Sequence, residues 1–363
     1  MSWFLAALGF MVLIVLHELG HFTAAKLVGM RVERFALFFP PLLLRKQIGE
    51  TEYAIGALPF GGYVKISGMS PAEDLPDEVR TRAYHAQPVW KRVVVIAAGP
   101  AVNLVVGFVL LVVYFGAIGP HDAAKGNKIN SVEKAYPAQD VLHAGDRVLA
   151  VNGHPGGPDQ LRKIVMADRC AGGSLAGGCR GAEPLKVTVF RSGRRITRQI
   201  TPQYDAARKQ MRLGFTYDPN SGPRETLAFG HSISRAGSSF VEITKQTFSI
   251  PAKILDKKQR DQIHGIVGSY EVTRQTILND AGDVIGIMAI ISLALAVVNL
   301  FPFLPLDGGH IFWAVVEKLR RRPVSYATME KSGMIGFALV AVLFVIGLSN
   351  DIGVLRGHGF GPP

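Results

Sequence analysis

The chain carries four long apolar stretches, separated by polar or charged sequence. They run from about Trp3 to Val28, from Val93 to Ile118, from Val284 to about Phe303 and from about Gly333 to Leu348. Each approaches the roughly 20 apolar residues that a helix needs to cross a bilayer. The pattern therefore predicts a polytopic α-helical membrane protein with about four transmembrane helices.

The basic residues predict how these helices are oriented. The N-terminus before the first stretch has no Lys or Arg, and the first stretch lacks the basic start and the cleavage site of a secretory signal. Basic residues follow the first stretch, precede the second, and separate the third from the fourth: Arg31, Arg34, Arg45, Lys46, Arg80, Arg82, Lys91, Arg92, Lys318, Arg320, Arg321, Arg322 and Lys331. Because basic loops stay on the cytoplasmic side, we expect a multi-pass protein of the inner (cytoplasmic) membrane with both termini outside the cytoplasm.

The composition agrees with a membrane protein. Hydrophobic residues make up 48% of the 363 residues and the mean hydropathy is positive, yet the formal net charge is +12. The excess of Lys and Arg indicates cytoplasmic loops or contact with anionic membrane lipid. The charges are scattered beside apolar segments and are not interleaved with aromatic residues on one face, so we expect no binding to nucleic acid.

The region between the second and third apolar stretches has a different character. Residues 119 to 217 alternate short strand-like runs with turns, most clearly at Val141–Gly153 and Leu185–Phe190. We expect one extracytoplasmic α+β domain here, between membrane segments at residues 1 to 118 and 283 to 363. Residues 218 to 282 are expected to form an extracytoplasmic linker, in which the periodicity of residues 240 to 254 predicts a helix on the membrane surface.

The only two cysteines, Cys170 and Cys179, both lie in the region assigned to the outside. The eight residues between them include four glycines, which make the spacer flexible enough to close a ring. Since an extracytoplasmic compartment is oxidising, we expect a disulfide between them.

A His-Glu-Leu-Gly-His run lies inside the first apolar stretch. His17 and His21 are four residues apart, so on a helix both imidazoles can reach the same cation. Glu18 lies beside them, where its carboxylate could accept a proton from a water polarised by that cation. The alternative is a buried histidine pair that only packs helices together, but it would bury three polar groups without a nearby partner.

The end of the third apolar stretch offers a third metal ligand. Pro302 and Pro305 break the helix, and the residues that follow are Asp307, two glycines and His310. By the topology above, Asp307 reaches the same side of the membrane as the two histidines. Asp307 could also cap the following helix, which does not exclude coordination. His310 is the alternative third ligand.

With these motifs the chain resembles the site-2 protease family of intramembrane zinc metalloproteases, in particular the bacterial type of regulated intramembrane proteolysis with an extracytoplasmic PDZ domain. Residues 17 to 21 and Leu306-Asp307-Gly308 match the family's two metal motifs. Gly49–Lys65 resembles its re-entrant β-hairpin loop, and Gly99–Asn103 resembles the motif that opens its second helix. The similarity spans almost the whole chain. It implies one zinc ion held by His17, His21 and Asp307, with Glu18 as the catalytic base.

The resemblance also implies where a substrate would bind. Strand-like runs at residues 52 to 55 and 63 to 66 predict a hairpin in a loop over about residues 42 to 68. An exposed edge in this hairpin could pair with an unwound substrate segment, through Tyr53, Ile55, Gly61, Gly62 and Tyr63. The alternative is a hairpin at the cytoplasmic face that never contacts the substrate.

Two asparagines place neutral amides in apolar helices. Asn299 lies where the family uses an asparagine to hold the substrate backbone, and Asn103 is a second candidate for this role. Either amide could hold a substrate carbonyl or the developing oxyanion. Hydrogen bonding between helices is the alternative for both.

The sequence Gly145–Gly153 resembles PDZ domains of bacterial membrane proteases. About 100 residues are available, so we expect one such domain, where the best-known Gram-negative members have two. Such a domain could bind a peptide end as an added strand. However, the usual carboxylate-binding loop is not recognisable, so the domain could instead exclude substrates with large ectodomains.

The resemblance implies a zinc endopeptidase that cleaves transmembrane segments of membrane proteins. Its substrates would be anti-sigma factors or remnant signal peptides, already trimmed by another protease. A catalytically inactive membrane-anchored PDZ adaptor is the alternative, against which the intact Glu18 argues. A metal transporter is disfavoured because the chain has one intramembrane ligand cluster and no detectable inverted repeat.

Overall fold

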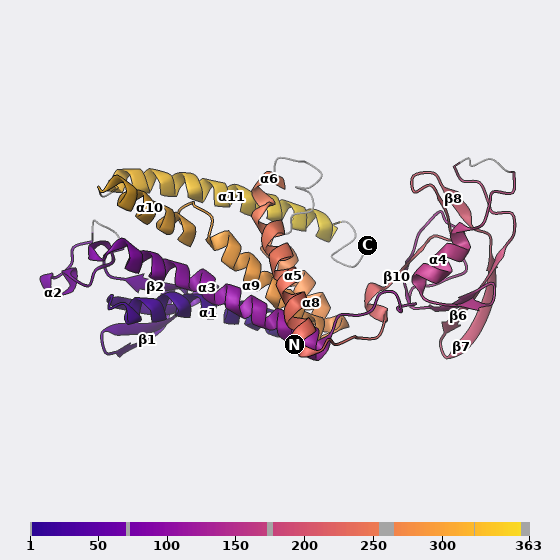
Figure 1. Cartoon of the computed structure of the whole chain (residues 1–363), viewed down its shortest axis with the longest axis horizontal. Helices are drawn as coiled ribbons and strands as arrows, with labels where there is room; N and C mark the ends of the chain where they lie inside the picture. Colours follow the sequence, from indigo (N-terminus) through magenta and orange to yellow (C-terminus); the bar gives the residue numbers. More distant parts are fainter. Residues whose placement is uncertain (1, 70–72, 173–176, 254–264, 323, 357–363) are drawn as a thin grey trace. The chain divides into compact units, whose positions relative to one another are not determined.

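The computed structural model describes residues 2–69, 73–172, 177–253, 265–322 and 324–356. The chain forms two compact units (Figure 1). The first contains Met1–Gly116 and Ala228–Gly361, and the second contains Ala117–Leu227. The second unit is thus inserted between the two parts of the first. This division assigns residues 228 to 282, expected to be a linker, to the unit that carries the apolar helices.

Within the described residues, three helices of the first unit are long and apolar enough to cross a membrane. The candidate spans are Trp3–Leu27 in α1 (Ser2–Leu27), Val89–Ile118 in α3 (Val89–Val113) with its following π-helical turn (Tyr114–Ile118), and Ala327–Gly353 in α11 (Tyr326–Arg356). The third expected stretch forms α9 (Asp283–Asn299), a shorter helix of 17 residues. At 1.5 Å per residue α9 is about 25 Å long, slightly less than the roughly 30 Å hydrocarbon core.

The other helices of this unit within the described residues are all shorter than the three candidate spans. They are α2 (Asp77–Arg80), η1 (Tyr84–Ala86), α5 (Phe229–Phe248), α6 (Ile250–Lys253), α8 (Ile266–Asn279) and α10 (Asp307–Arg320).

Helix α3 is central to the first unit, where it packs against α1, α5, α9 and α10. Small residues bring these helices close together. A Cβ atom at Gly20 of α1 would lie 2.7 Å from the Ala98 carbonyl oxygen of α3. A Cβ atom at Gly107 of α3 would lie 2.6 Å from a methyl carbon of Leu293 on α9. Such close contacts between apolar helices provide packing energy where the hydrophobic effect is absent.

Helix α5 begins earlier than the sequence predicts. The expected helix covered residues 240 to 254, whereas α5 starts at Phe229 and α6 ends at Lys253. Its inner face packs on α3 and α9 through the fully buried Ala236 and through Phe240, whose ring lies 6.1 Å from that of Phe108. The expected residue 254 lies outside the described residues.

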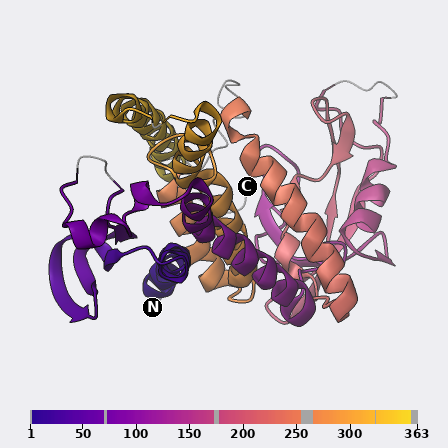
Figure 2. The same ribbon diagram turned by 60° about the vertical axis from the view of Figure 1, so that its left-hand side comes forward.

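Two long strands, β1 (Val32–Ile48) and β2 (Thr51–Ile66), follow α1 and fold into one curved sheet (Figure 2). Each strand bends and contributes two segments. The first segment of β1, Arg34–Leu37, pairs on one side with Gly62–Lys65 and on the other with Glu52–Ile55. Glu52–Ile55 in turn pairs with Leu44–Gln47. The order across the sheet is therefore 62–65, 34–37, 52–55 and 44–47.

This order corrects the expected hairpin. The runs 52 to 55 and 63 to 66 do not pair with each other, because β1 lies between them, and the sheet begins at Val32, ten residues before the expected loop. Gly56 lets β2 cross over β1, since a Cβ atom there would lie 2.2 Å from the Phe39 carbonyl oxygen. Residues 52 to 55 are thus inside the sheet, and residues 62 to 66 form an edge.

Charged groups fasten the sheet to the end of α1. Arg82 donates two hydrogen bonds to the Glu50 carboxylate, at 2.7 and 2.8 Å, and Lys26 of α1 donates a third at 2.8 Å. Glu50 lies in the turn between β1 and β2. The Arg82 guanidinium and the Lys26 ammonium lower the pKa of Glu50 to about 2.

The second unit is a small α+β domain, as expected. A four-stranded sheet has the order β5 (His154–Pro155), β4 (Arg147–Val151), β6 (Leu185–Arg191), β7 (Arg194–Ile200). Two further pairs are β3 (Ile129–Val132) with β10 (Phe215–Tyr217) and β8 (Gln203–Asp205) with β9 (Gln210–Arg212). Helix α4 (Pro158–Met166) buries Leu161 and Val165 in the core. A short 3₁₀ turn, η3 (Pro219–Ser221), follows β10.

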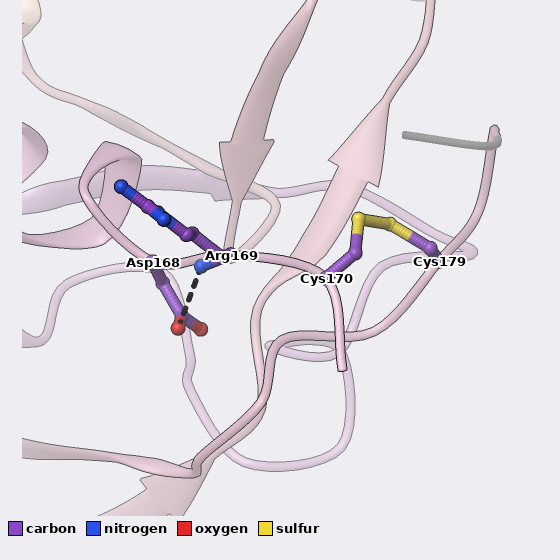
Figure 3. Close-up of a disulfide and its surroundings, with 4 residues drawn as sticks. All are labelled: Asp168, Arg169, Cys170 and Cys179. Atoms are coloured by element: carbon purple, nitrogen blue, oxygen red, sulfur yellow. Dashed lines mark hydrogen bonds between the residues drawn. A yellow bond between two sulfur atoms is a disulfide. The ribbon is translucent and has the colours of Figure 1, made fainter. Parts of the chain in front are cut away.

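The two cysteines form a disulfide in the second unit (Figure 3). The Cα atoms of Cys170 and Cys179 are 5.8 Å apart. Beside them the Asp168 carboxylate accepts a hydrogen bond from the Arg169 backbone N–H at 2.9 Å, drawn as a dashed line in Figure 3. Cys170 also forms a backbone bridge with Gly181, which closes the base of the loop.

Candidate metal centre

The two histidines of the first apolar stretch lie one turn apart on α1 and converge. The Nε2 atoms of His17 and His21 are 3.3 Å apart, and only 6% and 8% of these residues is exposed. A spacing of four residues places both imidazoles on one face of α1. Contacts with Val95 of α3 and Asp307 of α10 show that this face is directed toward those two helices.

Asp307 brings a third ligand atom to the same point. It is the first residue of α10, and its Oδ2 lies 3.2 Å from His17 Nε2 and 3.3 Å from His21 Nε2. Oδ2 is buried, and these two imidazole nitrogens lie beside it. The three ligand atoms thus form a nearly equilateral triangle. In tetrahedral zinc sites with Zn–N bonds of about 2.0–2.1 Å, neighbouring ligand atoms are about 3.3 Å apart, so this donor set fits zinc.

Two glycines place Asp307 at this position. A Cβ atom at Gly308 would lie 2.2 Å from the Leu300 carbonyl oxygen, and one at Gly309 would lie 2.4 Å from the Leu304 backbone nitrogen. The start of α10 therefore folds back tightly on the loop that follows α9. The N-cap residue is Leu306, so Asp307 is inside the helix and does not cap it.

His310, the alternative third ligand, is not one of the converging residues. The only group of His, Cys, Asp or Glu ligand atoms that includes His17, among the described residues, consists of His17, His21 and Asp307. His310 lies one turn along α10 and is partly buried.

Helix α3 supports His21 through two contacts that the sequence analysis missed. His21 Nδ1 donates a hydrogen bond to the Val95 carbonyl oxygen at 2.9 Å, which leaves Nε2 unprotonated and able to bind a metal. A Cβ atom at Gly99 would lie 2.3 Å from His21 Nε2. The Gly99-Pro100 motif thus provides space for the imidazole, because only glycine lets α3 approach so closely.

Asn103 lies behind His17. Its amide nitrogen is 3.3 Å from His17 Nδ1, and its backbone carbonyl accepts a hydrogen bond from the Ser292 hydroxyl at 2.8 Å. The residue is fully buried. The Asn103 side chain therefore contacts His17, a proposed metal ligand, at Nδ1 and not at Nε2. This contact differs from the substrate contact expected for Asn103.

Glu18 adjoins the ligands on one side and the β-sheet on the other. It is partly buried and lies within electrostatic range of His17, His21 and Asp307. A Cβ atom at Gly62 of β2 would be 3.0 Å from Glu18 Cγ. The backbone of the sheet edge therefore runs directly beside the carboxylate, and the absence of a side chain at Gly62 makes this possible.

The other hairpin candidates divide into two groups. Tyr53 packs inward, with its ring 6.0 Å from that of Phe22 on α1, while Ile55 is 39% exposed. Tyr63 is on the edge segment, where its hydroxyl accepts a hydrogen bond from Arg34 at 3.3 Å. Gly61 precedes Gly62 at the start of this edge. Tyr63, Gly61 and Gly62 are thus on the segment that approaches Glu18, whereas Tyr53 and Ile55 are inside the sheet.

Asn299 is the last residue of α9 and is partly buried. The chain then turns through Leu300 and the prolines before it reaches Asp307, eight residues later. The amide is thus at the end of a helix, where the helical hydrogen bonding stops.

An ion pair holds α10 against α3. Arg92 donates two hydrogen bonds to the Glu317 carboxylate, at 3.0 and 2.8 Å. The Arg92 side chain is 9% exposed and the Glu317 side chain 28%. Planar, bidentate pairing of this kind fixes geometry as well as charge. Because Asp307 is on α10 and the residues that support His21 and His17 are on α3, this pair connects the two halves of the centre.

The chain is similar to known proteins over most of its length. Residues 5–343 match the model of peptidase family M50. "Putative zinc metalloprotease CPE1693" of Clostridium perfringens (strain 13 / Type A) is 31% identical to the chain, with 96% of this chain and 97% of that protein covered. "Putative zinc metalloprotease slr1821" of Synechocystis sp. is 34% identical, with 88% and 86% covered.

Among solved structures, the PDZ domain of an SdrC-like protein from Listeria monocytogenes matches with a TM-score of 0.21 and 19% identity. It covers 26% of this chain and 87% of that one.

Proposed function

The chain belongs to peptidase family M50, and from this premise we propose that it is a zinc endopeptidase that cleaves transmembrane segments within the membrane. One observation carries the proposal: two histidines within a candidate span and an aspartate of α10 form a ligand triangle that fits zinc, beside a glutamate. We assign zinc binding to His17, His21 and Asp307.

Zinc held by His17, His21 and Asp307 would supply a Lewis acid for a substrate carbonyl and would lower the pKa of a bound water to about 7. Glu18 accepts the proton of the attacking water and then returns it to the leaving amide nitrogen. Its place between the ligands and Gly62 supports this role, because a substrate backbone beside Gly62 would lie next to the carboxylate. Burial among apolar helices excludes bulk water from the reaction.

The edge of the sheet at residues 62 to 66 holds the substrate. A transmembrane helix satisfies its own amides, so its scissile bond is accessible only after local unwinding. An added strand along this edge replaces the lost hydrogen bonds. Asn299, at the end of α9, holds a substrate carbonyl with its amide. The proposed substrate contacts are therefore Gly61, Gly62, Tyr63 and Asn299.

The proposed substrates are transmembrane proteins already trimmed by another protease, of the anti-sigma factor or remnant signal peptide type. We place the enzyme in the inner membrane with both termini and the α+β unit outside the cytoplasm, and α9 as a fourth span. The α+β unit would act as a single PDZ domain that restricts access by large ectodomains. The pattern of basic loops supports this orientation.

Purified Glu18→Gln protein tests the mechanism. We expect about one zinc per chain and no cleavage of a transmembrane reporter, because the ligands remain and the base is lost. Asp307→Ala and His17→Ala should lose both zinc and activity. Wild-type turnover by Glu18→Gln would refute the mechanism. Wild-type protein that binds zinc but cleaves no membrane substrate would support the inactive PDZ adaptor instead.

A further inference from the structure

His17 and His21 differ in what holds the ring nitrogen that faces away from Asp307. His21 Nδ1 donates to a backbone carbonyl, so its tautomer is fixed with Nε2 unprotonated. His17 Nδ1 faces a side-chain amide, that of Asn103, which can either donate or accept. The tautomer of His17 therefore depends on which amide atom faces the ring.

In the observed orientation of the Asn103 amide, its nitrogen is 3.3 Å from His17 Nδ1. The amide oxygen is buried and makes no hydrogen bond. With the nitrogen as donor, Nδ1 accepts and the ring proton is on Nε2, directed toward Asp307. A protonated Nε2 cannot bind a metal. A half-turn of the amide exchanges its nearly isosteric oxygen and nitrogen, so that Nδ1–H donates to Oδ1 and Nε2 is free.

We propose that Asn103 is a positioning residue that holds His17 in the zinc-binding tautomer by accepting a hydrogen bond from Nδ1–H. Complete burial removes water as a competing acceptor. The Ser292 hydroxyl fixes the Asn103 backbone carbonyl, so the amide is presented from a rigid position on α3. This role differs from substrate binding, because the amide contacts the far side of a ligand.

The inference rests on the proposed zinc site, and zinc affinity tests it without any measurement of cleavage. Full-length proteins are purified, loaded with zinc and titrated with a competing chelator. Asn103→Leu removes the hydrogen-bond partner of His17 Nδ1, so we expect it to weaken zinc binding by about 10- to 100-fold. Asn103→Asp retains an acceptor and should stay within about threefold of wild type.

Ser292→Ala is the matched control. It removes a buried hydrogen bond to the same residue but leaves the amide beside His17, so zinc affinity should change by no more than about threefold. Cobalt-loaded Asn103→Leu should also show altered visible absorption bands, since the orientation of one ligand changes. If Asn103→Leu does not yield monodisperse protein, Asn103→Ala takes its place.

Three results would overturn the inference. Unchanged zinc affinity in Asn103→Leu, with cleavage lost, would assign Asn103 to the substrate. Equal weakening in Ser292→Ala and Asn103→Leu would indicate a packing effect. If Asn103→Asp weakened zinc binding as much as Asn103→Leu, a hydrogen-bond acceptor beside His17 Nδ1 would not be the cause of the effect. A wild-type protein that binds no zinc would instead refute the proposed function itself.

Discussion

Gly62 of β2 lies directly against Glu18 of α1. A Cβ atom at Gly62 would be 3.0 Å from Glu18 Cγ and 3.1 Å from the Ala36 carbonyl oxygen. The sheet edge therefore borders the proposed base with backbone alone. A substrate strand that pairs with this edge would be aligned beside the carboxylate by hydrogen bonds that do not depend on its side chains.

Gly62→Ala should lower turnover while zinc content stays normal. The added methyl group must displace Glu18 or the Ala36 carbonyl, and a misplaced catalytic group can cost about 10- to 100-fold in rate. Reporter cleavage and metal analysis of the same preparation measure both effects. Gly237→Ala in α5, where nothing lies within 4 Å of an added Cβ, is the control and should be neutral. Normal turnover in Gly62→Ala would remove Gly62 from the substrate path.

Proline at the edge should impair cleavage in a substrate-dependent way. Successive N–H groups of a strand point to opposite sides. Only one of the two variants Tyr63→Pro and Val64→Pro therefore removes an N–H donor that faces away from β1. That variant should lose more turnover on stable substrate helices than on substrates that carry helix-breaking residues. Leu44→Pro, at the opposite edge of the sheet, is the control. Equal losses on both substrate types would indicate misfolding.

Separation of Arg92 from Glu317 should weaken the metal centre. Glu317→Gln leaves a buried guanidinium without its charge partner, which destabilises by up to about 3 kcal/mol and loosens α10. We expect a lower melting temperature in detergent and faster zinc loss to a chelator. The double variant Arg92→Leu/Glu317→Leu should recover part of the stability, since no charge is left unpaired. No recovery would mean that the guanidinium has a further role.

The disulfide provides a test of both stability and topology. Closure of a loop of about ten residues should stabilise the second unit by at most about 2.7 kcal/mol, so Cys170→Ser should lower its stability by up to that amount. In intact cells, Cys170 and Cys179 should resist alkylation until they are reduced. Reaction of both thiols without reductant would contradict an extracytoplasmic location.

Acid should loosen the connection between the sheet and α1. The pKa of Glu50 is lowered from 4.5 to about 2, so its ion pairs contribute stability above about pH 4.5 and lose it as the pH falls toward 2. Glu50→Gln should flatten the decrease in melting temperature over this window. The side chains of Lys26, Glu50 and Arg82 are 31%, 33% and 43% exposed, so high salt should reduce the difference. Identical pH profiles for the two proteins would remove Glu50 as a contributor.

Local spacing predicted which three side chains converge in the candidate centre. The pair His17 and His21 follows from helical geometry, and Asp307 follows from the break after Pro302 and the glycines beside it. The contacts of Val95, Gly99 and Asn103 did not follow, since they depend on where α3 crosses α1. No pattern within either helix specifies that crossing.

The sheet was less predictable than the helices. Strand-like runs at residues 52 to 55 and 63 to 66 were correctly identified as strands, but their pairing was wrong. Apolar residues continue from Leu42 to Leu44 without a clear alternation, so the sequence does not indicate that β1 bends and separates the two runs. The pairing of residues 34 to 37 with both 52 to 55 and 62 to 65 depends on how β1 and β2 bend in the folded sheet.

The division of the proposed ligands between α1 and α10 would link zinc affinity to the docking of α10. Close packing at Gly20 and Gly99 brings α1, which carries both histidines, against α3, whereas Asp307 belongs to α10, which the Arg92–Glu317 ion pair connects to α3. Any motion that undocks α10 removes a ligand, and by thermodynamic reciprocity bound zinc favours the docked state to the same extent. Bound zinc would therefore stabilise the docked position of α10 in addition to its role in catalysis. The rate of zinc exchange would then measure how often α10 undocks.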